Sequence, residues 1–226
     1  SIITGTSPNK HGIWGFTDFL PGSHTIRYPN YNQLQKLPFW EKDDRRTVVI
    51  NVPNTYPARE MDGKHVAGFV APDLKRAAYP NELASWLESI DYRVDADLNL
   101  ADQSRKAFLN DLFEVLEKRI KVYRKLWEER WDTFFVVFTG TDRLFHHFWD
   151  DCVDEGEQHH DDCMEFLRKV DEVVGEIDKK RPKDSTLTVV SDHGFGPLEG
   201  GLNINAVLKH HDYLEIDEQN NIQPSS

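Results

Sequence analysis

The sequence predicts an α/β fold, and three observations support this. Short β-branched or aromatic runs, which are typical of buried strands, occur at 47–52, 133–138 and 187–191. A long apolar stripe at helical spacing separates the first two runs, between residues 104 and 131. At 226 residues, with 38% hydrophobic and 12% aromatic residues, the chain can bury one substantial core. We therefore expect a sheet with a helical insertion.

The helices are predicted between these strands in chain order. Residues 80–90 are expected to form a short helix, and residues 92–99 an extended segment. The next helix spans 104–131, because apolar residues recur there at steps of three and four. Its stripe consists of Phe108, Leu112, Leu116, Ile120, Tyr123 and Trp127. After an acidic segment, a further helix is expected over 164–178.

Charge and hydropathy exclude two broad classes. The formal net charge is −12, whereas binding to a nucleic-acid duplex depends mainly on Lys and Arg surfaces. No uninterrupted apolar run approaches the roughly 20 residues of a membrane-spanning helix. This portion of the chain is therefore expected neither to bind duplexes nor to span a membrane, although a small phosphate substrate remains compatible with the acidic composition.

Two of the predicted strands lead directly into Asp and His residues. The run at 133–138 is followed by Asp142 and His146, and the run at 187–191 by Asp192 and His193. Since ligands of open α/β sheets bind beyond the carboxyl ends of the strands, these side chains are expected to meet in one crevice. Carboxylate with imidazole suits zinc or manganese better than calcium. Each motif alone could also be an ordinary turn, with Asp capping a helix.

The first motif holds further candidates. If a helix begins near Asp142, then Asp142 and His146 share one face and can bind one ion. His147 could replace His146 as the ligand, but it points about 100° away and is expected either to pack or to support a ligand through a hydrogen bond. Arg143 could clamp a substrate phosphate or pair with a neighbouring carboxylate.

Four blocks of the sequence occur in an order that resembles a known family. They lie at 4–13, 51–57, 141–146 and 191–197, the last two with the sequences Thr-Asp-Arg-Leu-Phe-His and Ser-Asp-His-Gly-Phe-Gly-Pro. In these blocks the chain is similar to the type I phosphodiesterases and nucleotide pyrophosphatases of the alkaline phosphatase superfamily. The resemblance implies an alkaline-phosphatase-like sheet flanked by helices on both faces, with a mainly helical cap insertion.

The resemblance also implies a division of the chain and a site. Residues 1–72 and 131–226 would form two parts of the catalytic core, and residues 73–130 the cap. Asp142 and His146 match ligands of one metal ion, and Asp192 and His193 ligands of a second. The ions would be zinc, or alternatively manganese, in a phosphohydrolase acting on a small phosphodiester, phosphomonoester or nucleotide.

Other groups of the family's site are expected outside this sequence. The Thr or Ser nucleophile, which becomes phosphorylated, is expected about six residues before Ser1, so the chain is interpreted as incomplete at both ends. A further metal-binding His is expected downstream, and neither His210 nor His211 is a convincing match. The compartment is expected to be the cytoplasm, with secretion or a periplasmic location left open because no leader can be read.

Three alternatives remain open at this point. The chain could be a phosphoryl-group transferase or mutase of the same superfamily, or a non-catalytic relative that uses the fold for binding. A separate zinc site could be formed by residues of the acidic segment, although their spacing fits no common zinc module. That set is Cys152, His159, His160 and Cys163.

Overall fold

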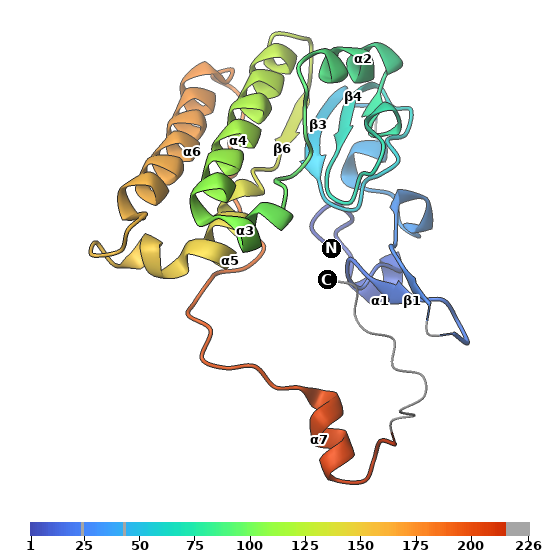
Figure 1. Ribbon diagram of the computed structural model, residues 1–226. Helices are drawn as coiled ribbons and strands as arrows, with labels where there is room; N and C mark the ends of the chain where they lie inside the picture. The colour runs from blue at the N-terminus through green and yellow to red at the C-terminus, as the bar shows by residue number, and fades with distance from the viewer. Residues whose placement is uncertain (24, 43, 216–226) are drawn as a thin grey trace. The chain divides into compact units, whose positions relative to one another are not determined.

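The computed structural model describes residues 1–23, 25–42 and 44–215. The chain forms two compact units, Ser1–Val190 and Ser191–Ser226. The first contains a four-stranded sheet and most of the helices (Figure 1). Its elements are α1 (Pro8–His11), β1 (Asp18–Phe19), β2 (Ile26–Arg27), η1 (Tyr31–Gln33), η2 (Phe39–Glu41), β3 (Thr47–Val52), β4 (Gly63–Ala67), η3 (Leu74–Arg76), β5 (Ala78–Tyr79), α2 (Asn81–Ser89), α3 (Asn99–Gln103), α4 (Arg105–Trp127), β6 (Thr133–Val136), α5 (Gly140–Val153) and α6 (His160–Lys180). The second contains α7 (Ile204–His210).

The sheet has the order β5-β4-β3-β6 and is mostly parallel. The strand β3 pairs in parallel with β4 and with β6, and the short strand β5 pairs antiparallel with β4. All six residues of β3 are buried, as expected for a central β-branched strand. The prediction of β3 is confirmed residue for residue, and β6 is shorter than its predicted run at 133–138.

The larger core lies on one face of the sheet. Val48 and Ile50 of β3 point into it, and the apolar stripe of α4 packs there together with residues of α2, α5 and α6. Figure 1 shows α4 and α6 side by side on this face, and their contacts bury Phe166 completely. The predicted helix at 104–131 is thus confirmed, with Ser104 as its N-cap.

The opposite face of the sheet is covered by the N-terminal segment. Val49 of β3 packs there against Tyr31 and Trp40, which belong to the short 3-10 helices η1 and η2. Helices therefore flank both faces, but they are long only on the side of α4.

One predicted strand is corrected by the structure. Residues 187–191 form neither strand nor helix, and Val189 and Val190 are 69% and 62% exposed. A strand requires a hydrogen-bonded partner, and in the part of the chain that the structure describes none lies beside this run. Conversely, β4 was not predicted, because Lys64 and His65 interrupt its apolar pattern.

Candidate metal centre

The candidate centre is built at the carboxyl end of β6. The amide of Val137 donates to the carbonyl of Ile50 at 3.0 Å, so the chain still follows β3 just beyond the strand. It then turns at Thr139 into α5. Gly140 allows this turn to approach α6, because a Cβ atom at this position would lie 2.6 Å from the ring of Phe166. Asp142 consequently lies in the first helical turn, next to the edge of the sheet.

Asp142 and His146 lie on one face of α5, as predicted from their spacing. Asp142 Oδ1 is 3.6 Å from His146 Nε2. Two atoms that each bind one tetrahedral zinc ion at about 2.1 Å lie about 3.4 Å apart. The observed separation is close to that value, so the donor types and their spacing fit a divalent cation held between them.

His147 contacts a different part of the structure. Its ring packs edge-to-face on Phe108 of α4, with 4.8 Å between the ring centroids. This contact fixes α5 against α4 and agrees with the packing role predicted for His147.

Arg143 is held by two carboxylates. Its Nε donates to Asp95 Oδ2 at 3.1 Å, its Nη2 donates to the same oxygen at 2.5 Å, and its Nη1 donates to Asp142 Oδ2 at 3.1 Å. Only 17% of the Arg143 side chain and 9% of the Asp95 side chain are exposed. The guanidinium also lies 5.2 Å from the ring centroid of Phe69. Of the two roles considered for Arg143, the pairing with neighbouring carboxylates is the arrangement seen.

A second arginine, Arg119, connects the turn before Asp142 with the segment that carries Asp95. Arg119 of α4 is 2% exposed, and its guanidinium donates to the carbonyls of Val137 and Val94 at 3.0 and 2.7 Å. It also donates to Thr139 Oγ1 at 3.2 Å. These bonds tie the turn before Asp142 to the segment that carries Asp95. A cavity of about 10 Å³, roughly the space of one water molecule, lies beside this arginine.

Asn51 completes this connection at the end of β3. It has a φ of 63°, a left-handed conformation that asparagine tolerates better than most residues. Its amide nitrogen donates to the carbonyl of Val94 at 2.7 Å, and its side-chain oxygen accepts from Tyr92. Burial raises the pKa of Tyr92, and the charge of Arg119 opposes that effect. The buried phenol therefore stays a hydrogen-bond donor.

The second predicted pair lies in the Ser191–Ser226 unit. Asp192 Oδ2 is 3.8 Å from His193 Nε2. His193 Nδ1 lies 3.0 Å from the carbonyl oxygen of Gly194, which can only accept a hydrogen bond. A neutral His193 is therefore protonated on Nδ1 and carries its lone pair on Nε2, the arrangement of a metal-binding histidine.

Each pair supplies two donors. Among residues 1–23, 25–42 and 44–215, no three His, Cys, Asp or Glu side chains converge into a larger metal-binding group. The two pairs belong to separate compact units, and their meeting in one crevice stays a prediction. Cys152 and Cys163 are free thiols, and burial raises the pKa of Cys163 to about 12.

The chain matches the type I phosphodiesterase / nucleotide pyrophosphatase family over residues 1–225. It belongs to this family. The sheet with flanking helices is therefore an alkaline-phosphatase-like fold, and the family is one of hydrolases that act on phosphate esters. No curated protein and no solved structure gives a significant match. No helix in the described part of this family member is long and apolar enough to cross a membrane.

The roles of Asp95 and Arg119 were not predicted from the sequence. Asp95 lies 48 positions before Arg143 and its local pattern marks only an extended segment. Arg119 did carry a signal, because it lies between Leu116 and Tyr123 on the apolar face of α4. A charged residue at such a position must find buried partners.

Proposed function

We propose that this protein is a two-metal phosphohydrolase that cleaves a small phosphodiester or phosphomonoester, including nucleotides. The nucleophile is a Thr or Ser before Ser1, and it is transiently phosphorylated. The observation that carries the proposal is the pair Asp142–His146, at 3.6 Å, in the first turns of a helix that starts at the carboxyl end of a parallel strand. Family membership supports the same chemistry.

Residues 187–191 lie outside the sheet in the structure, and we propose that in the full-length protein they add to it as a strand, which would bring the second pair to the first. The outer edge of β6 has no partner among the described residues, and the run 188–190, which is exposed, follows β6, α5 and α6 in the chain. A right-handed crossover through two helices returns a strand parallel to β6. Pairing in this way would cover Val189 and Val190 and carry Asp192 and His193 to the same edge of the sheet as Asp142.

The two pairs would hold zinc or manganese ions, which supply charge stabilisation to the attacking and leaving oxygens of an in-line displacement at phosphorus. The chain's own residues orient these ligands. The carbonyl of Gly194 keeps the lone pair of His193 on Nε2, and Arg143 holds one oxygen of Asp142. Residues 73–130 include β5 of the sheet and α4, which packs on it, so the cap that selects the leaving group would be formed by the parts of this segment outside that core.

A transferase or mutase reaction and a non-catalytic role are the competing functions. The family match favours hydrolysis over transfer, because its members act on phosphate esters. The Asp142–His146 pair favours a metal-dependent role over a purely structural one, since a carboxylate and an imidazole at this spacing can bind one divalent cation.

The test is steady-state hydrolysis by the full-length protein. An aryl phosphodiester and the matching monoester are compared before chelation, after chelation, and after zinc or manganese is returned. We expect activity that is lost on chelation and restored by metal, with the preferred ester class evident from kcat/KM. Bound metal without cleavage of either ester would favour transferase or mutase chemistry, and no bound metal would contradict the proposal.

Strand addition has its own measurement. In the full-length protein, the amides of residues 188–190 should exchange hydrogen as slowly as those of β6, because backbone hydrogen bonds of a sheet protect them. Rapid exchange in this run, with β6 protected, would contradict the proposed meeting of the two pairs.

A further inference from the structure

Arg143 lies between two carboxylates that have different positions in the site. Its Nη2 donates to Asp95 Oδ2 at 2.5 Å and its Nε to the same oxygen at 3.1 Å, while Nη1 makes one bond of 3.1 Å to Asp142. The Asp95 side chain is 9% exposed and that of Asp142 is 31% exposed. Arg143 is therefore bound mainly to the buried carboxylate of Asp95. It makes only one hydrogen bond to Asp142, the carboxylate proposed as a metal ligand.

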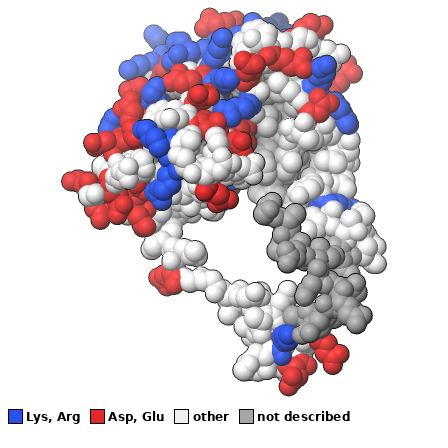
Figure 2. Space-filling model, viewed as in Figure 1, with Lys and Arg blue, Asp and Glu red and all other residues white. Residues whose placement is uncertain are grey.

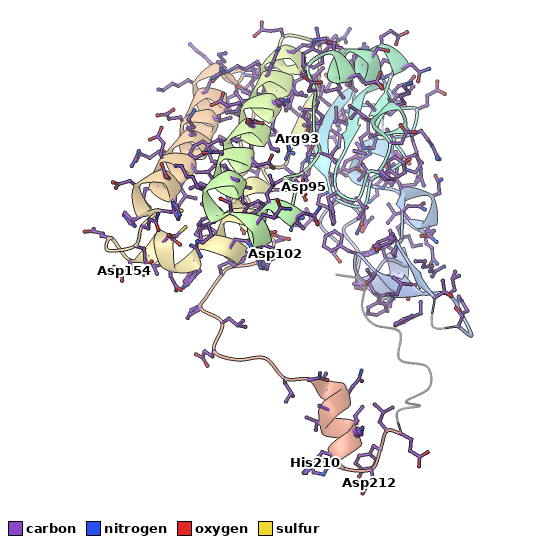
Figure 3. All side chains as sticks on the ribbon, viewed as in Figure 1. Arg93, Asp95, Asp102, Asp154, His210 and Asp212 are labelled. Atoms are coloured by element: carbon purple, nitrogen blue, oxygen red, sulfur yellow. The ribbon has the colours of Figure 1, made fainter. Side chains whose placement is uncertain are left out.

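The backbone of Asp95 is held in place independently of Arg143. The carbonyl of Val94 accepts from Arg119 at 2.7 Å and from Asn51 at 2.7 Å, and the amide of Ala96 donates to Asp95 Oδ1 at 3.0 Å. Figure 3 shows Asp95 on the segment that runs beside α4. Asp95 therefore acts as a fixed anchor, and the flexible arginine side chain is drawn to it.

We propose that Asp95 is a positioning residue that keeps Arg143 from neutralising Asp142, so that Asp142 can bind a divalent cation with His146. This inference rests on the proposed function, because it assigns a metal to Asp142. An arginine is always charged, and a cation and a guanidinium compete for the same carboxylate. With Asp95 in place, Arg143 contacts only Oδ2 of Asp142, and Oδ1 is the oxygen that lies 3.6 Å from His146 Nε2.

The decisive experiment measures metal affinity rather than activity. Zinc binding to the chelated full-length protein is titrated by competition with a chromophoric chelator, for the wild type and for Asp95→Asn. Removing the charge at Asp95 should free Arg143 to pair more closely with Asp142. We expect zinc to bind about 10- to 100-fold more weakly, the range measured when partners of metal ligands are removed.

A double substitution separates charge competition from loss of structure. Asp95→Asn combined with Arg143→Gln removes the competing cation as well, and zinc affinity should return to within about threefold of the wild type, as coupled residues are expected to be non-additive. If Asp95→Asn does not fold, the double variant is compared with Arg143→Gln alone. These two proteins should bind zinc equally, because Asp95 then has no arginine to restrain.

Asp111 provides a matched control. It lies on α4, and its side chain is 8% exposed. It pairs at 2.6 Å with Arg93, which lies two residues before Asp95. Asp111→Asn should lower the melting temperature without changing zinc affinity.

Three results would overturn the inference: unchanged affinity in Asp95→Asn, no recovery in the double variant, or an equal loss in Asp111→Asn. If the wild type itself bound no metal, the proposed function would fail first, and the inference would fail with it. Metal-dependent hydrolysis by the wild type with unchanged affinity in Asp95→Asn would refute the positioning role alone.

Discussion

The free energy of unfolding should fall between pH 7 and pH 5, in part because of His65. Replacing His65 with phenylalanine should make this fall about 2 kcal/mol smaller. His65 lies on β4 and is 1% exposed, and within residues 1–23, 25–42 and 44–215 neither of its ring nitrogens has a hydrogen-bond partner. Its ring packs edge-to-face on Tyr31, with 5.7 Å between centroids, and it also contacts Trp40. Burial, and secondarily the charge of Arg59, lower its pKa from 6.5 to about 3.

The magnitude follows from the difference between folded and unfolded pKa values. Above pH 6.5 the histidine is neutral in both the folded and the unfolded protein, so it does not lower the free energy of unfolding. As the pH falls below 6.5, the unfolded chain binds a proton that the folded protein does not, until the pH approaches about 3. Each pH unit in this window costs about 1.4 kcal/mol, and partial titration near pH 6.5 reduces the total between pH 7 and pH 5 to about 2 kcal/mol.

The assay is urea unfolding of the full-length protein at pH 7 and pH 5, in chelator, so that metal release does not add to the pH dependence. His65→Phe preserves the aromatic contacts and leaves no ring nitrogen to protonate. His210→Gln, at an exposed position of α7, controls for the loss of one histidine. If wild type and His65→Phe lose the same free energy of unfolding between the two pH values, His65 is not held neutral in the core.

Two further predictions concern α4 and α5. His146→Ala should lower kcat/KM more than about a hundredfold, since even the partners of metal ligands are worth 10- to 100-fold, whereas His147→Ala should act mainly on stability. A comparable collapse of activity in both variants would show that the wrong histidine was assigned to the metal. Arg119→Met should lower the free energy of unfolding by about 3 kcal/mol, because three partly buried acceptors lose a charged donor. Arg124→Met removes an exposed ion pair from the same helix and should cost less than about 1 kcal/mol, and an equal loss in both would refute the argument.

The sequence predicted the elements whose signals are local. The apolar stripe of α4 and the β-branched run of β3 each carry the periodicity of their structure, and both were found where predicted. On the face in Figure 2, Lys and Arg are interspersed with Asp and Glu over α4 and α6. By contrast, β4 has polar residues at two of its five positions, and its burial depends on the layers that pack on it.

The candidate site, too, could be predicted only where its signals are local in the sequence. The distance between Asp142 and His146 follows from helix geometry alone, since residues four apart share a face, and the structure confirms it. Asp95 and Arg119 were missed because their partners lie far away in sequence, 48 residues away for the Asp95–Arg143 pair. Such contacts follow from the parallel pairing of β3 with β6 and from the packing of α4, which no local pattern encodes.

Asn51 shows how the fold couples residues 92–95 to the turn that carries Asp142. Its left-handed backbone shifts the register between Ile50 and Val52, so that Val52 faces the same core as Val49. The Asn51 side chain hydrogen-bonds with Tyr92 and with the carbonyl of Val94. Arg119 binds that same carbonyl and also Thr139. A change in residues 92–95 should therefore alter the turn that carries Asp142, because both segments are bonded to the same buried groups.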